Sequence, residues 1–340
     1  MRRWFVIACL AVACVTNPPP PNYYGGGGGG GGGGQYPPPD DPEVMAAAQR
    51  DAITRDGKLV DSKVLFDFDG GQLEFEMYQL GHRVVQTARN RYAVPVMVSW
   101  SIGAMENLHA VTMPAGVILL PPAPQPLGMG PIVILAELER VDTTQRFNRE
   151  LTTRTRFGDP GVQPSDYQYA LPFPRGQTFS VLQGFHGAFS HHGSNEFAVD
   201  FDCPVATPVL AARPGIIVVA NATAQGSGTT PEFLEYRRTN FVLVMHEDGT
   251  LGEYMHLAPA TVQVKPGQRV ERGQQLALSG NTGFSSTPHL HFQVMTAARD
   301  GIAARSFPFT MAVAPGRVEE PTVSQRYTGW ETRADPPPMR

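Results

Sequence analysis

Cysteine and positive charge are both scarce in this sequence. Only three cysteines occur among the 340 residues, and Cys9 and Cys14 lie near the N-terminus. If Cys14 becomes a lipidated N-terminus, Cys203 is the only other cysteine of the mature chain, which excludes an intrachain disulfide and a cysteine-rich zinc site. The formal net charge of −4 provides no basic field, so we expect no nucleic-acid partner. Because a cysteine-rich metal site is excluded, any bound metal must be held by histidine and carboxylate side chains.

Long apolar runs are confined to the first residues, which are typical of an export signal. Two arginines precede an apolar stretch from Trp4 to Val12. The segment Leu10-Ala-Val-Ala-Cys14 resembles the bacterial lipobox, in which the cysteine becomes the lipidated N-terminus. We therefore expect residues 1–14 to be a lipoprotein signal and Cys14 to carry a membrane anchor on the periplasmic face of the outer membrane. An ordinary secreted protein with a cleaved signal is the alternative.

Proline and glycine gather in residues 15–57, where ten consecutive glycines stand between proline-rich stretches. Such a segment has little to bury, so we predict a disordered tether, with a short helix toward its end. Short alternating runs such as Leu73-Glu-Phe-Glu-Met then predict strands throughout the rest of the chain. The predicted fold class is all-β, with a β-sandwich-like accessory domain over 58–156 and a second β-domain over 160–316. Residues 317–340 are predicted to be an irregular tail.

Seven of the nine histidines lie between positions 186 and 291. In His289-Leu-His291 one residue separates the two imidazoles, and residues i and i+2 of a strand face the same way. Asp200 lies in the apolar run Phe197-Ala-Val-Asp-Phe, where a lone carboxylate is costly unless a cation or hydrogen-bond donors compensate it. These patterns favour a metal site, although Asp200 could instead cap a turn, and Asp202 faces the same side of the predicted strand.

Four further stretches follow one another in a recognisable order. With the segment that begins at Asp200, they resemble the lysostaphin-type, LytM-like zinc endopeptidases over about 130 residues. The resemblance implies a barrel-like β-sheet core with an open groove, the duplicated hybrid motif architecture. The stretches are Glu253-Tyr-Met-His-Leu, Gly267-Gln-Arg-Val-Glu-Arg-Gly, Ser279-Gly-Asn-Thr-Gly-Phe-Ser and Pro288-His-Leu-His-Phe.

The resemblance also implies roles for individual residues. Asp200 stands four positions before the proline of its motif, as the family's metal-binding aspartate does, and Asp202 does not fit that register. His291 matches a second zinc ligand. His256 and His289 match the two catalytic histidines that lie outside the metal's first coordination shell.

The first metal ligand departs from the family's commonest pattern. Many members have a histidine four residues before the aspartate, where this chain has Glu196. One branch instead carries Ser-His about nine residues upstream, and Ser190-His191 is similar to it. We therefore predict His191 as the ligand, with His192 as its nearest rival and Glu196 as a weaker one.

The resemblance implies a zinc-dependent metalloendopeptidase with one Zn²⁺ in its peptidase domain and peptidoglycan as its substrate. Two imidazoles and one carboxylate leave a fourth zinc position for water, as catalytic sites require. A zinc-activated water would then hydrolyse peptide bonds in stem peptides or crosslinks. The alternative is a catalytically inactive LytM-like scaffold that activates a cell-wall amidase. A residue of the required type at all five positions favours the enzyme over the scaffold, while a general secreted protease is a third possibility.

Overall fold

The computed structural model describes residues 50–66 and 72–330, which fall within one compact unit. The predicted signal, the predicted lipidation site at Cys14 and nearly all of the tether lie outside these residues. Residues 50–56 are helical, at the position where the tether was predicted to end in a short helix. In the described part of the chain, no helix is both long and apolar enough to cross a membrane.

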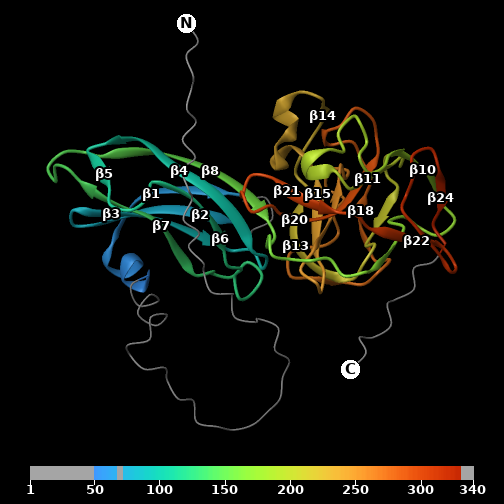
Figure 1. Ribbon diagram of the computed structural model, residues 1–340, viewed down its shortest axis with the longest axis horizontal. Coiled ribbons are helices and arrows are strands. Elements are labelled where there is room, and N and C mark those ends of the chain that lie inside the picture. Colours follow the sequence, from blue (N-terminus) through green and yellow to red (C-terminus); the bar gives the residue numbers. More distant parts are fainter. Residues whose placement is uncertain (1–49, 67–71, 331–340) are drawn as a thin grey trace, which may run out of the picture. The chain divides into compact units, whose positions relative to one another are not determined.

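The predicted all-β fold class is confirmed, because strands make up most of the regular structure (Figure 1). Strand β2 illustrates the cause: Leu73, Phe75 and Met77 are buried and alternate with Glu74 and Glu76, which are partly exposed. This period of two places one face of the strand in a core. Besides the strands, three short 3-10 helices are present among the described residues: η1 (Gly193–Asn195), η2 (Pro231–Leu234) and η3 (Tyr236–Arg238).

The first half of the described chain forms two antiparallel sheets, as expected of a sandwich-like domain. One sheet has the order β1-β2-β3-β7-β5 and the other β6-β4-β8. Their strands are β1 (Lys58–Leu65), β2 (Leu73–Leu80), β3 (Arg83–Asn90), β4 (Val96–Glu106), β5 (Leu108–Ala110), β6 (Ala115–Leu120), β7 (Ile132–Arg140) and β8 (Asn148–Phe157).

The second half is built on one large sheet with the order β17-β13-β15-β16-β20-β11-β10-β24, and β21 also pairs with β20. Every residue of β20 is buried, because the strand lies between two others and both of its faces are covered. The strands of this sheet are β10 (Thr178–Gln183), β11 (Ala198–Phe201), β13 (Gly215–Asn221), β15 (Phe241–Met245), β16 (Leu251–Met255), β17 (Arg269–Val270), β20 (Leu290–Ala297), β21 (Ala304–Phe307) and β24 (Arg326–Thr328).

One face of this sheet supplies the main hydrophobic core of the second half. Leu290, Phe292 and Val294 of β20 point into it, together with Phe201 of β11 and Tyr254 of β16. The second half also contains three smaller sheets. In these, β12 pairs with β18, β14 pairs with β19, and β22 pairs with both β9 and β23. Their strands are β9 (Gln168–Ala170), β12 (Pro208–Leu210), β14 (Ser227–Gly228), β18 (Gln275–Leu278), β19 (Gly283–Phe284), β22 (Thr310–Ala314) and β23 (Arg317–Glu319).

The prediction of an irregular tail from residue 317 is wrong for its described part. β23 pairs with β22, and β24 pairs with β10 at the edge of the large sheet. Tyr327 of β24 is buried in the main core, and the Trp330 indole N–H donates to the carbonyl of Ala312. The strands are three residues long, too short to show a periodic pattern, and partners distant in sequence hold them in place. The second β-domain, predicted over 160–316, therefore continues through the described residues to 330.

Candidate metal centre

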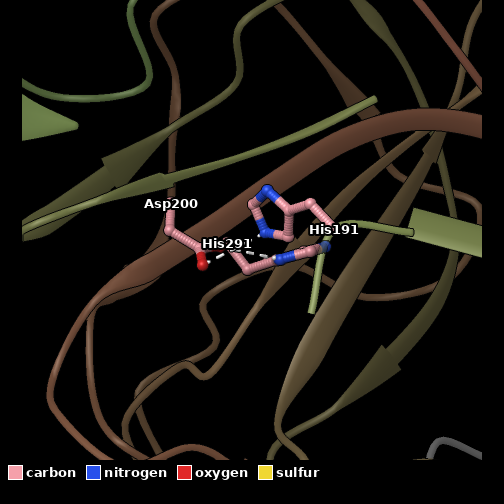
Figure 2. A group of neighbouring side chains, drawn as sticks. All are labelled: His191, Asp200 and His291. Atoms are coloured by element: carbon pink, nitrogen blue, oxygen red, sulfur yellow. Dashed lines mark hydrogen bonds and ion pairs between the residues drawn. The ribbon is translucent and has the colours of Figure 1, made fainter. Parts of the chain in front are cut away.

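Two of the predicted metal ligands are placed together by strand pairing alone. Asp200 of β11 stands directly opposite His291 of β20 in the antiparallel register. Cross-strand partners have Cβ atoms about 5 Å apart and share a face of the sheet. His291 Nδ1 accordingly lies 2.9 Å from Asp200 Oδ1. Figure 2 shows the Asp200 carboxylate beside both His291 and His191.

His191 reaches the same point from the loop between β10 and β11. Its side chain is fully buried, and its Nδ1 lies 2.8 Å from the carbonyl oxygen of Gly184. Because a carbonyl oxygen can only accept, Nδ1 carries the proton and Nε2 presents a lone pair. That Nε2 lies 3.1 Å from Asp200 Oδ2. His191, Asp200 and His291 thus form a buried group whose possible ligand atoms all lie within 4.8 Å of one another.

The rival ligands considered from the sequence lie elsewhere. His192 and Glu196 are exposed, and the Glu196 carboxylate lies 3.3 Å from His186 Nδ1. Asp202 is exposed as well and accepts a hydrogen bond from the Ser180 hydroxyl. The structure brings none of these three rivals into the buried group.

The buried group fits a metal by its donor set. The Nε2 atoms of His191 and His291 are buried and have no hydrogen-bond partner among the described residues. Two imidazoles and one carboxylate are the protein ligands of many catalytic zinc sites. Burial alone would raise the pKa of Asp200, but the neighbouring imidazoles of His191 and His291 hold it well below its usual range. The carboxylate is therefore ionised, as a ligand must be.

His256 and His289 flank this group, with ring centroids 4.5 Å apart. His256 Nδ1 lies 2.7 Å from the carbonyl oxygen of Thr282, and His289 Nδ1 lies 2.7 Å from that of Thr287. Both rings therefore carry the proton on Nδ1 and offer Nε2 as an acceptor. His289 Nε2 is 3.8 Å from Asp200 Oδ1, which places it beside the candidate ligands.

The backbone and the surroundings of His256 are both unusual. It follows β16 with a φ of 62°, in the left-handed region that a residue with a Cβ adopts only at a cost. Burial, together with the nearby His289 and His291, lowers its pKa to about 3. At neutral pH His256 is therefore uncharged, and its Nε2 can accept a hydrogen bond.

Gln183 belongs to the site but was not identified from the sequence. It ends β10, where it pairs with Asp200 across the strands. Its Nε2 donates to Asp200 Oδ2 at 2.8 Å, and its Oε1 accepts from the backbone N–H of Ser190 at 3.2 Å. One side chain thus orients the carboxylate and the loop that carries His191. The signal available in the sequence was a polar residue at the end of a strand, which by itself gives no function.

A groove of about 540 Å³ runs past the buried group. Apolar side chains line its walls, among them Phe189, Phe233, Leu234 and Phe284. Phe189 and Leu234 are large hydrophobic residues that stay exposed beside the groove. The groove can therefore hold an extended, partly apolar ligand against the candidate metal ligands.

Comparisons with known proteins agree on one family. Residues 194–304 match the model described as Peptidase family M23, a range that contains Asp200, His256, His289 and His291 but begins after His191. The chain is 36% identical over 142 residues to Glycyl-glycine endopeptidase ALE-1 of Staphylococcus capitis, covering 42% of this chain and 35% of that protein.

Two further relatives extend the comparison. Peptidoglycan DD-endopeptidase ShyA of Vibrio cholerae is 33% identical over 100 residues, covering 29% of this chain and 20% of that protein. The solved catalytic domain of the antimicrobial peptidase lysostaphin from Staphylococcus simulans is 28% identical, with a TM-score of 0.27, and the match covers 38% of this chain and 87% of that one. The match thus spans 35% of the length of ALE-1 and 20% of the length of ShyA.

Proposed function

We propose that the chain is a zinc-dependent endopeptidase of peptidase family M23, which hydrolyses peptide bonds in peptidoglycan stem peptides or crosslinks. One observation carries the proposal: a buried His-Asp-His group lies beside two histidines whose free ring nitrogens are acceptors. The names of its relatives support the substrate class, since ShyA is a peptidoglycan endopeptidase and ALE-1 a glycyl-glycine endopeptidase.

In this proposal His191, Asp200 and His291 hold one zinc ion. Zinc held by these residues would lower the pKa of a bound water to about 7 and would polarise the scissile carbonyl. Gln183 fixes the Asp200 carboxylate through its hydrogen bond. The apolar walls of the groove bind the peptide and exclude bulk water.

His256 and His289 provide the acid–base groups. The carbonyls of Thr282 and Thr287 hold their Nδ1 protons, so each Nε2 can take a proton and later return it to the departing amine. Once protonated, either imidazole can also stabilise negative charge on the carbonyl oxygen.

The location follows from the substrate. Peptidoglycan lies outside the cytoplasm, which agrees with an exported protein. We propose attachment to the outer membrane through a lipid on Cys14, with the tether giving the domain its reach. Residues 58–156 would then serve as an accessory β-domain for the peptidase domain.

Digestion of purified sacculi tests the function. The mature chain is incubated with sacculi, with and without chelator, and the released fragments are identified by mass spectrometry. We expect new peptide ends with the sugar–peptide bond intact, and their loss with chelator or in Asp200→Ala. Asp202→Ala, at an exposed carboxylate nearby, is the matched control and should digest like wild type. If wild type releases nothing alone but increases release by an added wall amidase, the scaffold alternative holds instead.

A further inference from the structure

Beyond the candidate ligands, the floor of the groove contains a second buried polar pair. Glu253 of β16 stands directly opposite Gln293 of β20, two residues along the strands from the Met255–His291 pair. Both side chains are 2% exposed, and both line the groove. Two strand residues span roughly 7 Å, so this pair lies about two peptide residues away from His291.

The contacts of this pair leave several oxygen acceptor positions without a donor. Gln293 Nε2 donates to Glu253 Oε2 at 2.5 Å and to Asn195 Oδ1 at 3.4 Å. The Tyr236 hydroxyl donates to Glu253 Oε1 at 3.2 Å. The remaining amide oxygen, Gln293 Oε1, is buried and has no hydrogen-bond partner within the described ranges. A buried acceptor without a donor costs about 1–3 kcal/mol, so a ligand that supplies the donor is favoured.

The charge of Glu253 is not balanced by a neighbouring cation. No ion pair joins it to a lysine, arginine or histidine in the part of the chain that the structure describes. Arg156 also lines the groove, but its guanidinium carbon lies over the Tyr236 ring, 5.9 Å from the centroid. An ionised carboxylate has about four acceptor positions, and Gln293 and Tyr236 fill two of them. Glu253 can therefore still accept hydrogen bonds from a cation that enters the groove.

We propose that Glu253 and Gln293 form a subsite for a primary ammonium group, carried by a diamino acid residue of the substrate within about two residues of the scissile bond. An ammonium has three donors and a positive charge, so it can bond both the Glu253 carboxylate and the unpaired Gln293 oxygen. An apolar side chain would leave the carboxylate without a cation and the amide oxygen without a donor. This inference rests on the proposed function and narrows its substrate class.

The first test measures binding without cleavage. The zinc-loaded full chain is titrated with Nα-acetyl-lysine methylamide and with its Nε-acetylated form, and binding is followed by NMR. Wild type should bind the free ammonium at least about tenfold more tightly than the acetylated form, because acetylation removes the positive charge and two of the three N–H donors. Glu253→Gln, which keeps an acceptor for Tyr236, should bind both forms equally. Glu247→Gln, at an exposed position, is the matched control and should behave like wild type.

The second test measures cleavage. Sacculi with free amines and sacculi with acetylated amines are digested by wild type and by Glu253→Gln. We expect acetylation to reduce kcat/KM at least about tenfold for wild type and to leave the variant's lower rate unchanged.

Each outcome of the two tests has a distinct meaning. Equal binding of both lysine derivatives by wild type overturns the ammonium subsite, and this comparison does not depend on how the variant folds. Equal digestion of both kinds of sacculi by wild type overturns it as well. If wild type digests neither, the proposed function fails, and the binding test still decides the subsite.

Discussion

The four buried histidines around Asp200 differ in the group that their Nδ1 atom contacts. Backbone carbonyls hold the Nδ1 protons of His191, His256 and His289, whereas His291 turns its Nδ1 toward Asp200. His191 and His291 contact Asp200 within 3.1 Å, but His289 stays 3.8 Å away. The distances to Asp200 support the proposed division between ligands and acid–base groups, whereas the Nδ1 contacts do not separate His191 from His256 and His289.

His289→Ala and His291→Ala should separate the two roles. We expect His289→Ala to retain zinc and to lose about 10²–10⁴-fold in kcat, the usual contribution of a general acid–base group. His291→Ala should lose zinc itself. Zinc content by atomic emission and steady-state rates on sacculi provide the measurement. Loss of zinc from His289→Ala as complete as from His291→Ala would place His289 among the ligands.

At the scale of elements, β10 connects the site to the end of the described chain. Its last residue, Gln183, orients Asp200, and its other edge is covered by β24. Tyr327 of β24 is buried in the core, and its hydroxyl accepts from the backbone N–H of Thr322. The strand that supports the carboxylate is therefore held by a segment more than a hundred residues away in sequence.

Gln183→Ala should weaken zinc binding without abolishing it. Residues that orient a metal ligand typically contribute 10- to 100-fold in affinity, so we expect a loss of about that size. Competition with a chromogenic chelator measures it. Gln263→Ala, which removes an exposed glutamine of the same domain, is the control. An unchanged zinc affinity in Gln183→Ala would show that the hydrogen bond to Asp200 is dispensable.

Tyr327→Ala should destabilise the fold. Removal of a buried aromatic side chain costs about 3–5 kcal/mol in the free energy of unfolding, so we expect a loss of that order. Urea unfolding of the full chain measures it, with Arg326→Ala at the exposed neighbouring position as the control. Equal stability of the two variants would mean that β24 adds little to the sheet.

The sequence predicted what local periodicity encodes. The period of two put His289 and His291 on one face of a strand, and the strand at Asp200 was placed by its apolar run. Pairings between distant strands, by contrast, have no local signal. The β24–β10 and Glu253–Gln293 pairs depend on register across the sheet, so neither could be found from the sequence.

For the whole molecule, a buried histidine outside the candidate site makes the stability of the fold depend on pH. His246 is 2% exposed, and its Nδ1 lies 2.9 Å from the carbonyl oxygen of Pro214. Burial, together with the positive charge of Arg213, lowers its pKa to about 4. In the unfolded chain a histidine has a pKa of about 6.5, so the unfolded state binds more protons between these two values.

The full chain should therefore lose stability as the pH falls from about 6.5 toward 4. Above this window the contribution of neutral His246 is complete, and the loss across it is on the order of 3 kcal/mol. Urea unfolding of the zinc-free chain at pH 7.5 and 4.5 measures the loss. His246→Gln should show a smaller difference between the two pH values. An equal difference in both proteins would assign the acid sensitivity to other groups.

A zinc titration tests the central claim most directly. Chelator-treated full chain receives increasing zinc, and bound zinc and cleavage of sacculus peptide bonds are measured on the same samples. The account predicts that cleavage rises in proportion to bound zinc, that both saturate at about one zinc per chain, and that both vanish in Asp200→Ala. Full cleavage by the zinc-free chain, or an Asp200→Ala variant that binds zinc and cleaves like wild type, would contradict it.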